Sequence, residues 1–379
     1  METIERLSSI HFLPAMHGDA FFIHCFRGEA EGWIIVDGGP NGNAKFNPFI
    51  KEVEKLPSKD LMVMTHIDDD HLKGILEYIR NHKKDRPFPV RKMWVNCARQ
   101  IDFIEGCKLS ASSGSKLADI LGKIESEDGI QWKDYITAGK QDDSIKFAEI
   151  TVLNPEKDIL EKFIPIYEED AKKHKTDGKK LSAQTDKRPQ EDYEISLTDL
   201  AKRPKSAPKE TNFSEFKNLV SIAFIIRCDG LEGLMLGDCF PEQIVKALTK
   251  LGYSKENKLK VDFVKVAHHG SRNNISNELL DMIDCINYLI PTNGGANACH
   301  PDREAMANII CHEGRSKETV HLYFNYTIMS IEARKEFKLF HEEELKDYNF
   351  EIHEPNKADA GQAYRITLNR RAEVCLGED

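Results

Sequence analysis

Short apolar runs separated by glycine-containing turns open the chain. They cover residues 9–13, 20–26 and 33–37 and are rich in Ile, Phe, Val and Trp. Runs of this length and composition predict β-strands, and three in quick succession predict an antiparallel meander. We therefore expect the fold to begin with a sheet.

The next two segments change period. Residues 61–65 form a short apolar run typical of a buried strand, whereas residues 74–84 carry apolar side chains at helical spacing. The polar segment 66–71 is thus predicted to lie in the loop that joins a strand to a helix. A rigid scaffold commonly presents functional groups in such loops.

The middle of the chain shifts in composition. Residues 93–95 predict a strand and residues 117–124 a helix, but residues 155–217 are rich in Lys, Asp, Glu, Ser and Pro. Because such a segment buries little apolar surface, it is predicted to be a solvated, partly disordered insertion. The alternative is a basic flap over an active site.

Regular structure resumes after this insertion. The predicted elements are strands at 219–226, 233–238, 261–269, 321–324 and 363–368 and a helix at 241–251. A chain of 379 residues suits either one large layered domain or two smaller ones. We expect one domain over 1–335 that carries the insertion, with 336–379 packing on it or completing it.

Composition and charge narrow the class of protein. A hydrophobic fraction of 40% supplies a substantial core. The formal net charge of −10 excludes a global electrostatic attraction to nucleic acid, because that attraction rests on Lys and Arg. A local basic groove stays open.

Cysteine usage and targeting signals indicate a compartment. The nine cysteines are scattered and form no C-x-x-C pair, which argues against a disulfide framework and a zinc ribbon. The first residues lack the basic start and apolar run of a secretory signal, and no stretch approaches the ~18 apolar residues of a membrane span. We expect a cytoplasmic protein that does not associate with membranes.

The densest chemistry lies between His66 and His71, in the sequence His-Ile-Asp-Asp-Asp-His. Two imidazoles and three carboxylates at the end of a strand form the ligand set for zinc, manganese or iron. Neighbouring carboxylates resist joint ionisation unless a cation is present. A solvated acidic loop is the alternative, but the flanking apolar strand and Gly74 argue against it.

The segment from Thr65 to Gly74, T-H-x-D-x-D-H-x-x-G, resembles the H-x-[H/D]-x-D-H signature of the metallo-β-lactamase superfamily. Further segments follow in the expected order: Gly18-Asp19-Ala20, Val36-Asp37-Gly38-Gly39, Asn218-x-x-Ser221, Leu236-Gly237-Asp238, Lys265-x-x-His268-His269-Gly270-Ser271 and His300-Pro301. The series resembles the hydrolase domain of bacterial DNA-uptake (competence) channel proteins and its free-standing relatives, including phosphorylcholine esterases.

The resemblance implies a four-layer α/β/β/α sandwich with two divalent metal ions, zinc or manganese. It implies that His66 and Asp68 bind one ion and that Asp238 bridges both. The second ion would be bound by Asp70, His71 and His268. A hydroxide between the ions would attack the substrate.

For each of these residues the local sequence also predicts a role without the resemblance. Asp238 follows an apolar strand, where a lone carboxylate needs a cation unless it caps the helix after Pro241. His268 and His269 end another strand, whose alternation aims one of them inward; His268 is the favoured ligand and His269 a proton donor. Asp37 orients a metal-bound histidine or forms a turn.

The remaining candidates would contact the substrate. Lys265, His269, Ser271 and Arg272 are placed to neutralise a phosphate, and His269 or His300 could protonate a leaving group. His300 lies in a glycine-rich loop, and an ordinary surface histidine is its alternative reading.

The chain also departs from the commonest pattern of this superfamily. The usual extra histidine between the signature and the bridging carboxylate has no clear counterpart, and Asp68 replaces an imidazole. Both changes shift the preference toward manganese or a mixed site. The expected substrate is a phosphodiester in a nucleic acid or nucleotide. The alternatives are a small ester, lactone or amide, or a metal-stabilised binding module without turnover; no protein partner is indicated.

Overall fold

The computed structural model describes residues 7–40, 48–81, 88–96, 131–133, 135–139, 144–163, 165–166, 190–204, 213–295, 300–314, 317–335, 338–356, 364–367 and 375–376. The helix predicted at 117–124 lies outside these residues.

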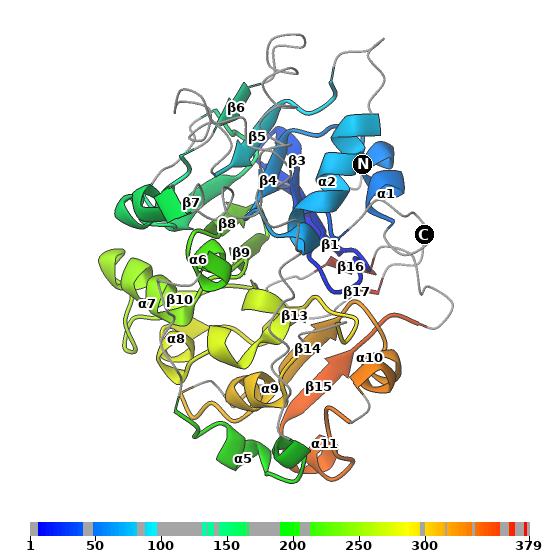
Figure 1. Ribbon diagram of the computed structural model, residues 1–379, viewed down its shortest axis with the longest axis vertical. Coiled ribbons are helices and arrows are strands. Elements are labelled where there is room, and N and C mark those ends of the chain that lie inside the picture. Colours follow the sequence, from blue (N-terminus) through cyan, green and yellow to red (C-terminus); the bar gives the residue numbers. More distant parts are fainter. Residues whose placement is uncertain are drawn as a thin grey trace, which may run out of the picture.

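One sheet contains the N-terminal strands (Figure 1). In the described part of the chain it has eight strands in the order β17-β16-β1-β2-β3-β4-β5-β6. Their bounds are β1 (Ser9–Phe12), β2 (Phe21–Arg27), β3 (Ala30–Val36), β4 (Leu61–Met64), β5 (Lys92–Val95), β6 (Gln131–Lys133), β16 (Tyr364–Thr367) and β17 (Cys375–Leu376). The predicted meander is confirmed, because β1, β2 and β3 pair antiparallel; β3 to β6 are parallel.

The second sheet of the described residues has seven strands in the order β15-β14-β13-β11-β9-β8-β7. Their bounds are β7 (Glu149–Asn154), β8 (Ala223–Cys228), β9 (Leu231–Met235), β11 (Phe263–Lys265), β13 (Asn287–Ile290), β14 (Val320–Phe324) and β15 (Phe350–His353). A separate small pair joins β10 (Leu259–Lys260) to β12 (Ile283–Asp284). Because β9, β11, β13, β14 and β15 are parallel, their carboxyl ends lie at one edge.

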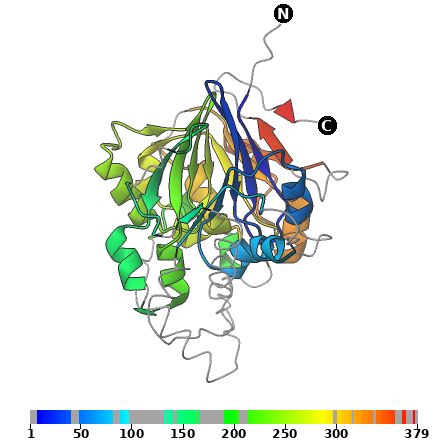
Figure 2. The same cartoon turned by 90° about the horizontal axis from the view of Figure 1, so that it is seen from above.

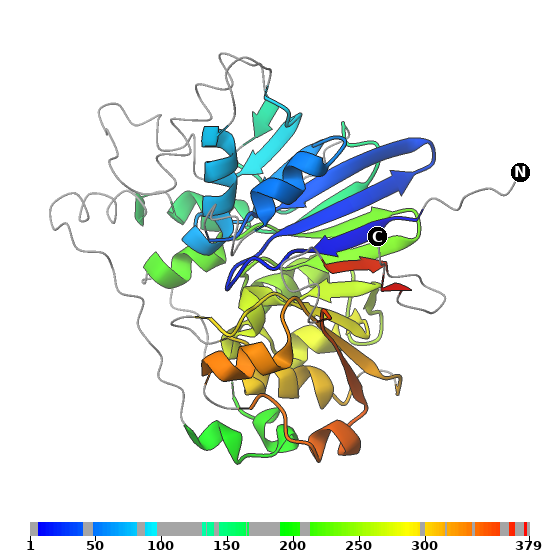
Figure 3. The ribbon, with the colours of Figure 1, turned by 90° about the vertical axis from the view of Figure 1, so that its right-hand side faces the viewer.

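The sheets pack face to face, and the alternation of side chains along each strand builds the layers (Figures 2 and 3). In β4, Leu61 and Val63 lie in the core between the sheets, whereas Met62 and Met64 face the outer helices. In β8, Phe224 enters the inter-sheet core and Ile225 the outer one. Such alternation is the period-two pattern of a strand buried on both faces.

Helices cover both outer faces. On the first sheet lie α1 (Phe49–Lys55) and α2 (Asp69–Asn81); on the second lie α7 (Pro241–Lys250), α8 (Asn277–Asp281), α9 (Arg303–Ile310) and α10 (Ile328–Lys335). The predicted four-layer α/β/β/α sandwich is confirmed. No helix among the described residues is long and apolar enough to cross a membrane.

Two local predictions are wrong in a way that matters for the site. Helix α2 begins at Asp69 rather than near Gly74, so Asp70 and His71 lie in its first turn, where acidic side chains favour the positive end of the helix dipole. The strand predicted to run to His269 ends at Lys265. It is followed by a 3-10 turn, Ala267–Gly270.

The charged segment 155–217 is packed at both of its described ends. Leu160 and Phe163 meet Phe216 and Leu219 in a small apolar cluster, and the last two belong to α6 (Phe213–Leu219). Between them, α5 (Leu197–Leu200) packs on α9. Residues 167–189 and 205–212 lie outside the described residues, so a basic flap in this segment stays a prediction, as do the domain limits 1–335 and 336–379.

Candidate metal centre

The candidate residues meet at the edge where strands of both sheets end. Asp37 follows β3 and His66 follows β4 in the first sheet, while Asp238 follows β9 and the His268-His269 pair follows β11 in the second. Carboxyl ends of neighbouring parallel strands share one edge, so strand order gathers the side chains within each sheet. The packing of the two sheets then brings the two sets together. The first turn of α2 adds Asp70 and His71.

Four imidazoles converge on the carboxylate of Asp238. Its Oδ2 lies 3.4 Å from Nε2 of His71, 3.7 Å from Nε2 of both His66 and His268, and 4.0 Å from Nε2 of His269. Asp238 is almost fully buried, and it does not cap α7, whose N-cap is Phe240. The carboxylate therefore faces the histidines.

The opposite ring nitrogen, Nδ1, is held by the protein. Nδ1 of His71 lies 2.8 Å from Oδ2 of Asp37. The hydroxyl of Thr65 donates to the same oxygen, and the backbone N–H of Thr65 donates to Oδ1 of Asp37. Nδ1 of His269 lies 3.0 Å from the Pro291 carbonyl. This arrangement fixes each ring and leaves Nε2 directed inward, which is how supporting residues orient histidine ligands.

His268 is held in the same manner but lies nearer the surface. Its Nδ1 is 3.2 Å from Oδ1 of Asn274, and its side chain is 29% exposed, against 4% for His269. Both residues have positive φ, 48° and 55°. The expectation that strand alternation turns only one of them inward is wrong, because the backbone has left the extended conformation and both Nε2 atoms face Asp238.

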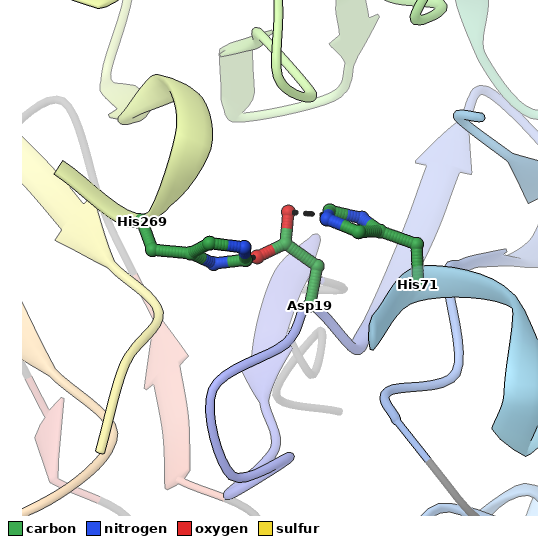
Figure 4. Close-up of side chains that lie close together, drawn as sticks. All are labelled: Asp19, His71 and His269. Carbon is green, nitrogen blue, oxygen red and sulfur yellow. Dashed lines mark ion pairs between the residues drawn. The ribbon is translucent and has the colours of Figure 1, made fainter. Parts of the chain in front are cut away.

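Asp19 is a functional candidate that sequence reasoning did not single out. Its carboxylate lies between two of the histidines (Figure 4), with Oδ1 3.1 Å from Nδ1 of His269 and Oδ2 3.7 Å from Nδ1 of His71. It also pairs with the buried ammonium of Lys265. The signal was present, because Gly18-Asp19-Ala20 is one of the segments of the resemblance. Gly18 is required there, since a Cβ would lie 1.9 Å from the Asp70 carbonyl oxygen.

Negative charge exceeds positive charge in this cluster. Five carboxylates, Asp19, Asp37, Asp68, Asp70 and Asp238, face the ammonium groups of Lys217 and Lys265, which leaves an excess of three negative charges when the imidazoles are neutral. Buried charge of one sign is costly unless it is neutralised. The cluster must therefore bind protons or cations.

The pKa directions show how protons fill this role. Burial alone would lower the pKa of His71, but the carboxylates around it, Asp238 foremost, raise that pKa well above its usual range. Burial likewise opposes protonation of His269, yet Asp19 and Asp238 raise its pKa to about 9. Burial would raise the pKa of Asp238, but the neighbouring imidazoles hold it well below its usual range.

The residues fit divalent metal ions on their own chemistry. Nε2 of His66, His71 and His269 is buried and has no hydrogen-bond partner among the described residues, and the same holds for Oδ1 of Asp238. A buried nitrogen that makes no hydrogen bond costs about 1–3 kcal/mol. Three such atoms turned toward one carboxylate form a nitrogen-and-oxygen donor set suited to zinc or manganese.

Asp68 and Asp70 extend this set on either side. Oδ2 of Asp68 lies 3.7 Å from Nε2 of His66, and Oδ2 of Asp70 lies 3.3 Å from Nε2 of His269. Asp68 also pairs with Lys217 of α6. Burial would raise the pKa of Asp68, but Lys217 and His66 together lower it to about 2. Sequence reasoning missed Lys217, since no local motif links it to Asp68.

Three of the predicted substrate-contacting residues, Lys265, Ser271 and Arg272, make contacts within the protein. Lys265 is 1% exposed and donates to the Gly237 carbonyl, so it lies behind the cluster instead of reaching substrate. Ser271 is buried and caps the short helical turn after it. Arg272 pairs with Asp302 and Asp192.

His300 lies beside His268. Its ring centroid is 5.0 Å from that of His268, and its Nδ1 is 3.2 Å from Oδ2 of Asp302. His17, which sequence reasoning overlooked, is half-buried on the other side. Burial lowers its pKa, and the charge of Asp70 opposes that effect. The rim is thus lined with imidazoles.

Comparisons with known proteins add little beyond the fold. No protein-family model and no curated protein matches the chain. Among solved structures it is similar to the metallo-β-lactamase fold protein YhfI from Bacillus subtilis, with TM-score 0.38, 7% identity and coverage of 94% of this chain and 98% of that one. Zn²⁺-bound PqqB from Methylobacterium extorquens gives TM-score 0.38, 9% identity and coverage of 92% and 98%.

A variant of the β-hydroxylase CmlA gives TM-score 0.39 and 14% identity over 82% of this chain, which spans about half (51%) of that structure. At such TM-scores and identities these likenesses do not assign an activity, so the assignment must come from the site. The site itself is a buried histidine and aspartate cluster, built by both sheets of an α/β/β/α sandwich, with the donor atoms for divalent metal ions.

Proposed function

We propose that this protein is a metal-dependent hydrolase that cleaves phosphodiesters in nucleic acids or nucleotides. The observation that carries the proposal is the convergence of four imidazole Nε2 atoms on the buried carboxylate of Asp238. The resemblance of the sequence motifs to the hydrolase domain of competence channel proteins supports the same activity.

We assign the ligands by the contacts of each side chain. His66 and Asp68 lie on one side of Asp238, Asp70 and His269 on the other, and His71 lies closest to Asp238 itself. His268 completes the set from the more exposed side. Divalent ions bound here would supply an activated water at neutral pH and would stabilise charge on the leaving oxygen.

The protein's own residues have separate tasks in this proposal. Asp37 and Asp19 hold the imidazoles of His71 and His269 in place. His300 at the rim is the proton donor for the leaving group, with its ring oriented by Asp302. No serine or cysteine nucleophile is needed.

The decisive experiment offers the metal-loaded protein three substrates: bis(p-nitrophenyl) phosphate, single-stranded DNA, and a chromogenic lactone or ester. We expect cleavage of a phosphodiester with Mn²⁺ or Zn²⁺. Cleavage of the lactone or ester alone would reject the phosphodiester assignment. Tight metal binding with no turnover would favour a binding module instead.

A matched pair of variants tests the site. Asp70→Asn removes a carboxylate that faces His269 and should lower turnover by at least about tenfold, since even residues that only support metal ligands have effects of about ten- to a hundredfold. Asp69→Asn changes the adjacent carboxylate, which points outward to Lys73 and is 57% exposed, and should leave turnover unchanged. Equal rates for both variants would place the activity elsewhere.

A further inference from the structure

A second group of side chains with metal-ligand atoms lies at the edge of the second sheet formed by β14 and β15. His321 of β14 and His353 of β15 present Nδ1 and Nε2, respectively, 2.9 Å apart. Oε2 of Glu351 lies 3.4 Å from the first nitrogen and 3.8 Å from the second. All three ligand atoms lie within 4.8 Å of one another.

The strand register explains why these side chains meet. In the parallel pair β14·β15, His321 lies opposite Glu351 and Tyr323 lies opposite His353, so all four side chains project from the same face of the sheet. The ring of His353 stacks on Tyr323 at 4.4 Å between centroids, and Tyr323 is fully buried. One imidazole is therefore fixed by the core, which reduces the entropy lost when a ligand binds.

We propose that His321, Glu351 and His353 form a separate binding site for Zn²⁺ or a similar divalent transition-metal ion. Two imidazoles and one carboxylate are the donor set of three-residue zinc sites, in which water takes the fourth position. Mg²⁺ and Ca²⁺ prefer sites made of oxygen atoms and fit poorly.

The separation of the nitrogen atoms agrees with this assignment. Two nitrogens bound at about 2.05 Å to a tetrahedral ion lie about 3.3 Å apart, so the rings need to move by only a few tenths of an ångström. Without an ion, the contact at 2.9 Å is a hydrogen bond, in which one ring donates a proton to the other. Ion binding replaces that proton.

The position of this site makes it independent of the centre at Asp238. That centre lies at the carboxyl ends of the strands, whereas His321 lies at the start of β14, about 13 Å along the strand from Asn325 at that edge. In the described sheet, β15 is the outermost strand. An ion here would join this edge strand to its neighbour and so stabilise the C-terminal part of the fold.

The test counts zinc in the full-length protein. Wild type and His321→Gln/His353→Gln are stripped with EDTA and dialysed against the same Zn²⁺ solution. Bound zinc per chain is then measured by mass spectrometry. We expect the double variant to bind one ion fewer than wild type and to lose part of the zinc-induced rise in melting temperature, while phosphodiester turnover is unchanged.

Two further variants complete the experiment. His24→Gln is the control variant. His24 also pairs with a glutamate on a neighbouring strand, Glu31, but this pair has no second histidine beside it, so the zinc count of His24→Gln should equal that of wild type. Glu351 is 61% exposed, so Glu351→Gln folds even if the double variant does not. It should weaken the additional site by about tenfold or more, since even residues that only support metal ligands have effects of this size. Equal zinc counts and affinities in every variant would overturn the proposal, whatever the fate of the catalytic centre.

Discussion

The buried pair of Asp19 and Lys265 allows a sharp test of how the centre is held together. Both side chains are at most 2% exposed, and the pair lies behind the histidines, where water does not screen it. Asp19→Asn keeps the shape but leaves the ammonium of Lys265 without its main partner. Breaking a buried ion pair by removing one member costs about 3–5 kcal/mol. Lys265 still donates to the Gly237 carbonyl and lies 3.8 Å from Oδ1 of Asp238, so we expect the low end, about 3 kcal/mol.

The assay is urea unfolding of EDTA-treated protein, followed by tryptophan fluorescence, with the denaturant slope compared between variants. Lys265→Met added to Asp19→Asn removes the stranded charge. Because replacing both members of a buried pair with neutral groups is often nearly neutral, the double variant should be more stable than Asp19→Asn alone. A loss below about 1 kcal/mol for the single variant, or a double variant no more stable than the single one, would refute this reasoning.

Three other perturbations test different parts of the molecule. The pKa of His269 is raised to about 9, so its protonation contributes stability that is fully present below about pH 6.5 and is lost as pH rises through 9. The difference in free energy of unfolding between metal-free wild type and His269→Gln should therefore fall by about 3 kcal/mol across that range. A difference that stays constant with pH would contradict this prediction. Gly74→Ala would place a Cβ 1.8 Å from the Gly38 carbonyl oxygen and should cost about 3 kcal/mol or more in thermal or urea unfolding, whereas Gly28→Ala, with open space and only a positive φ, should cost about 1 kcal/mol. Lys217→Gln frees the carboxylate of Asp68 and should tighten Zn²⁺ binding about fivefold by calorimetric titration, because displacing a partly buried ion pair costs about 1 kcal/mol; unchanged affinity would show that Asp68 is not a ligand.

The layers of the fold could be predicted from the sequence because they follow from local periodicity. Residues 61–65 and 241–251 are short enough, and apolar enough at regular spacing, that a strand and a helix are their natural states. The metal cluster followed in part from density alone, since carboxylates and imidazoles packed between His66 and His71 have few other uses.

The rest depended on contacts between residues far apart in the chain. Nothing near Lys265 in the sequence shows that it pairs with Asp19, and nothing near Asp68 points to Lys217. The prediction that only one of His268 and His269 points inward was wrong for a different reason. Strand alternation holds only while the backbone is extended, and positive φ at two successive residues cannot be read from a pattern of apolar positions.

The distribution of the centre over both sheets has a consequence for the order of events during synthesis. The side chains at positions 19 to 71 come from one layer and those at 238 to 269 from the other, so a nascent chain that ends before Asp238 holds only the half of the cluster that the first layer supplies. The complete set of donors exists only after the two layers have docked, and an ion bound there would stabilise the docked state. Because an ion that binds the docked layers and not the unfolded chain stabilises the native state, scarcity of the ion would lower the stability of the protein as well as its metal content.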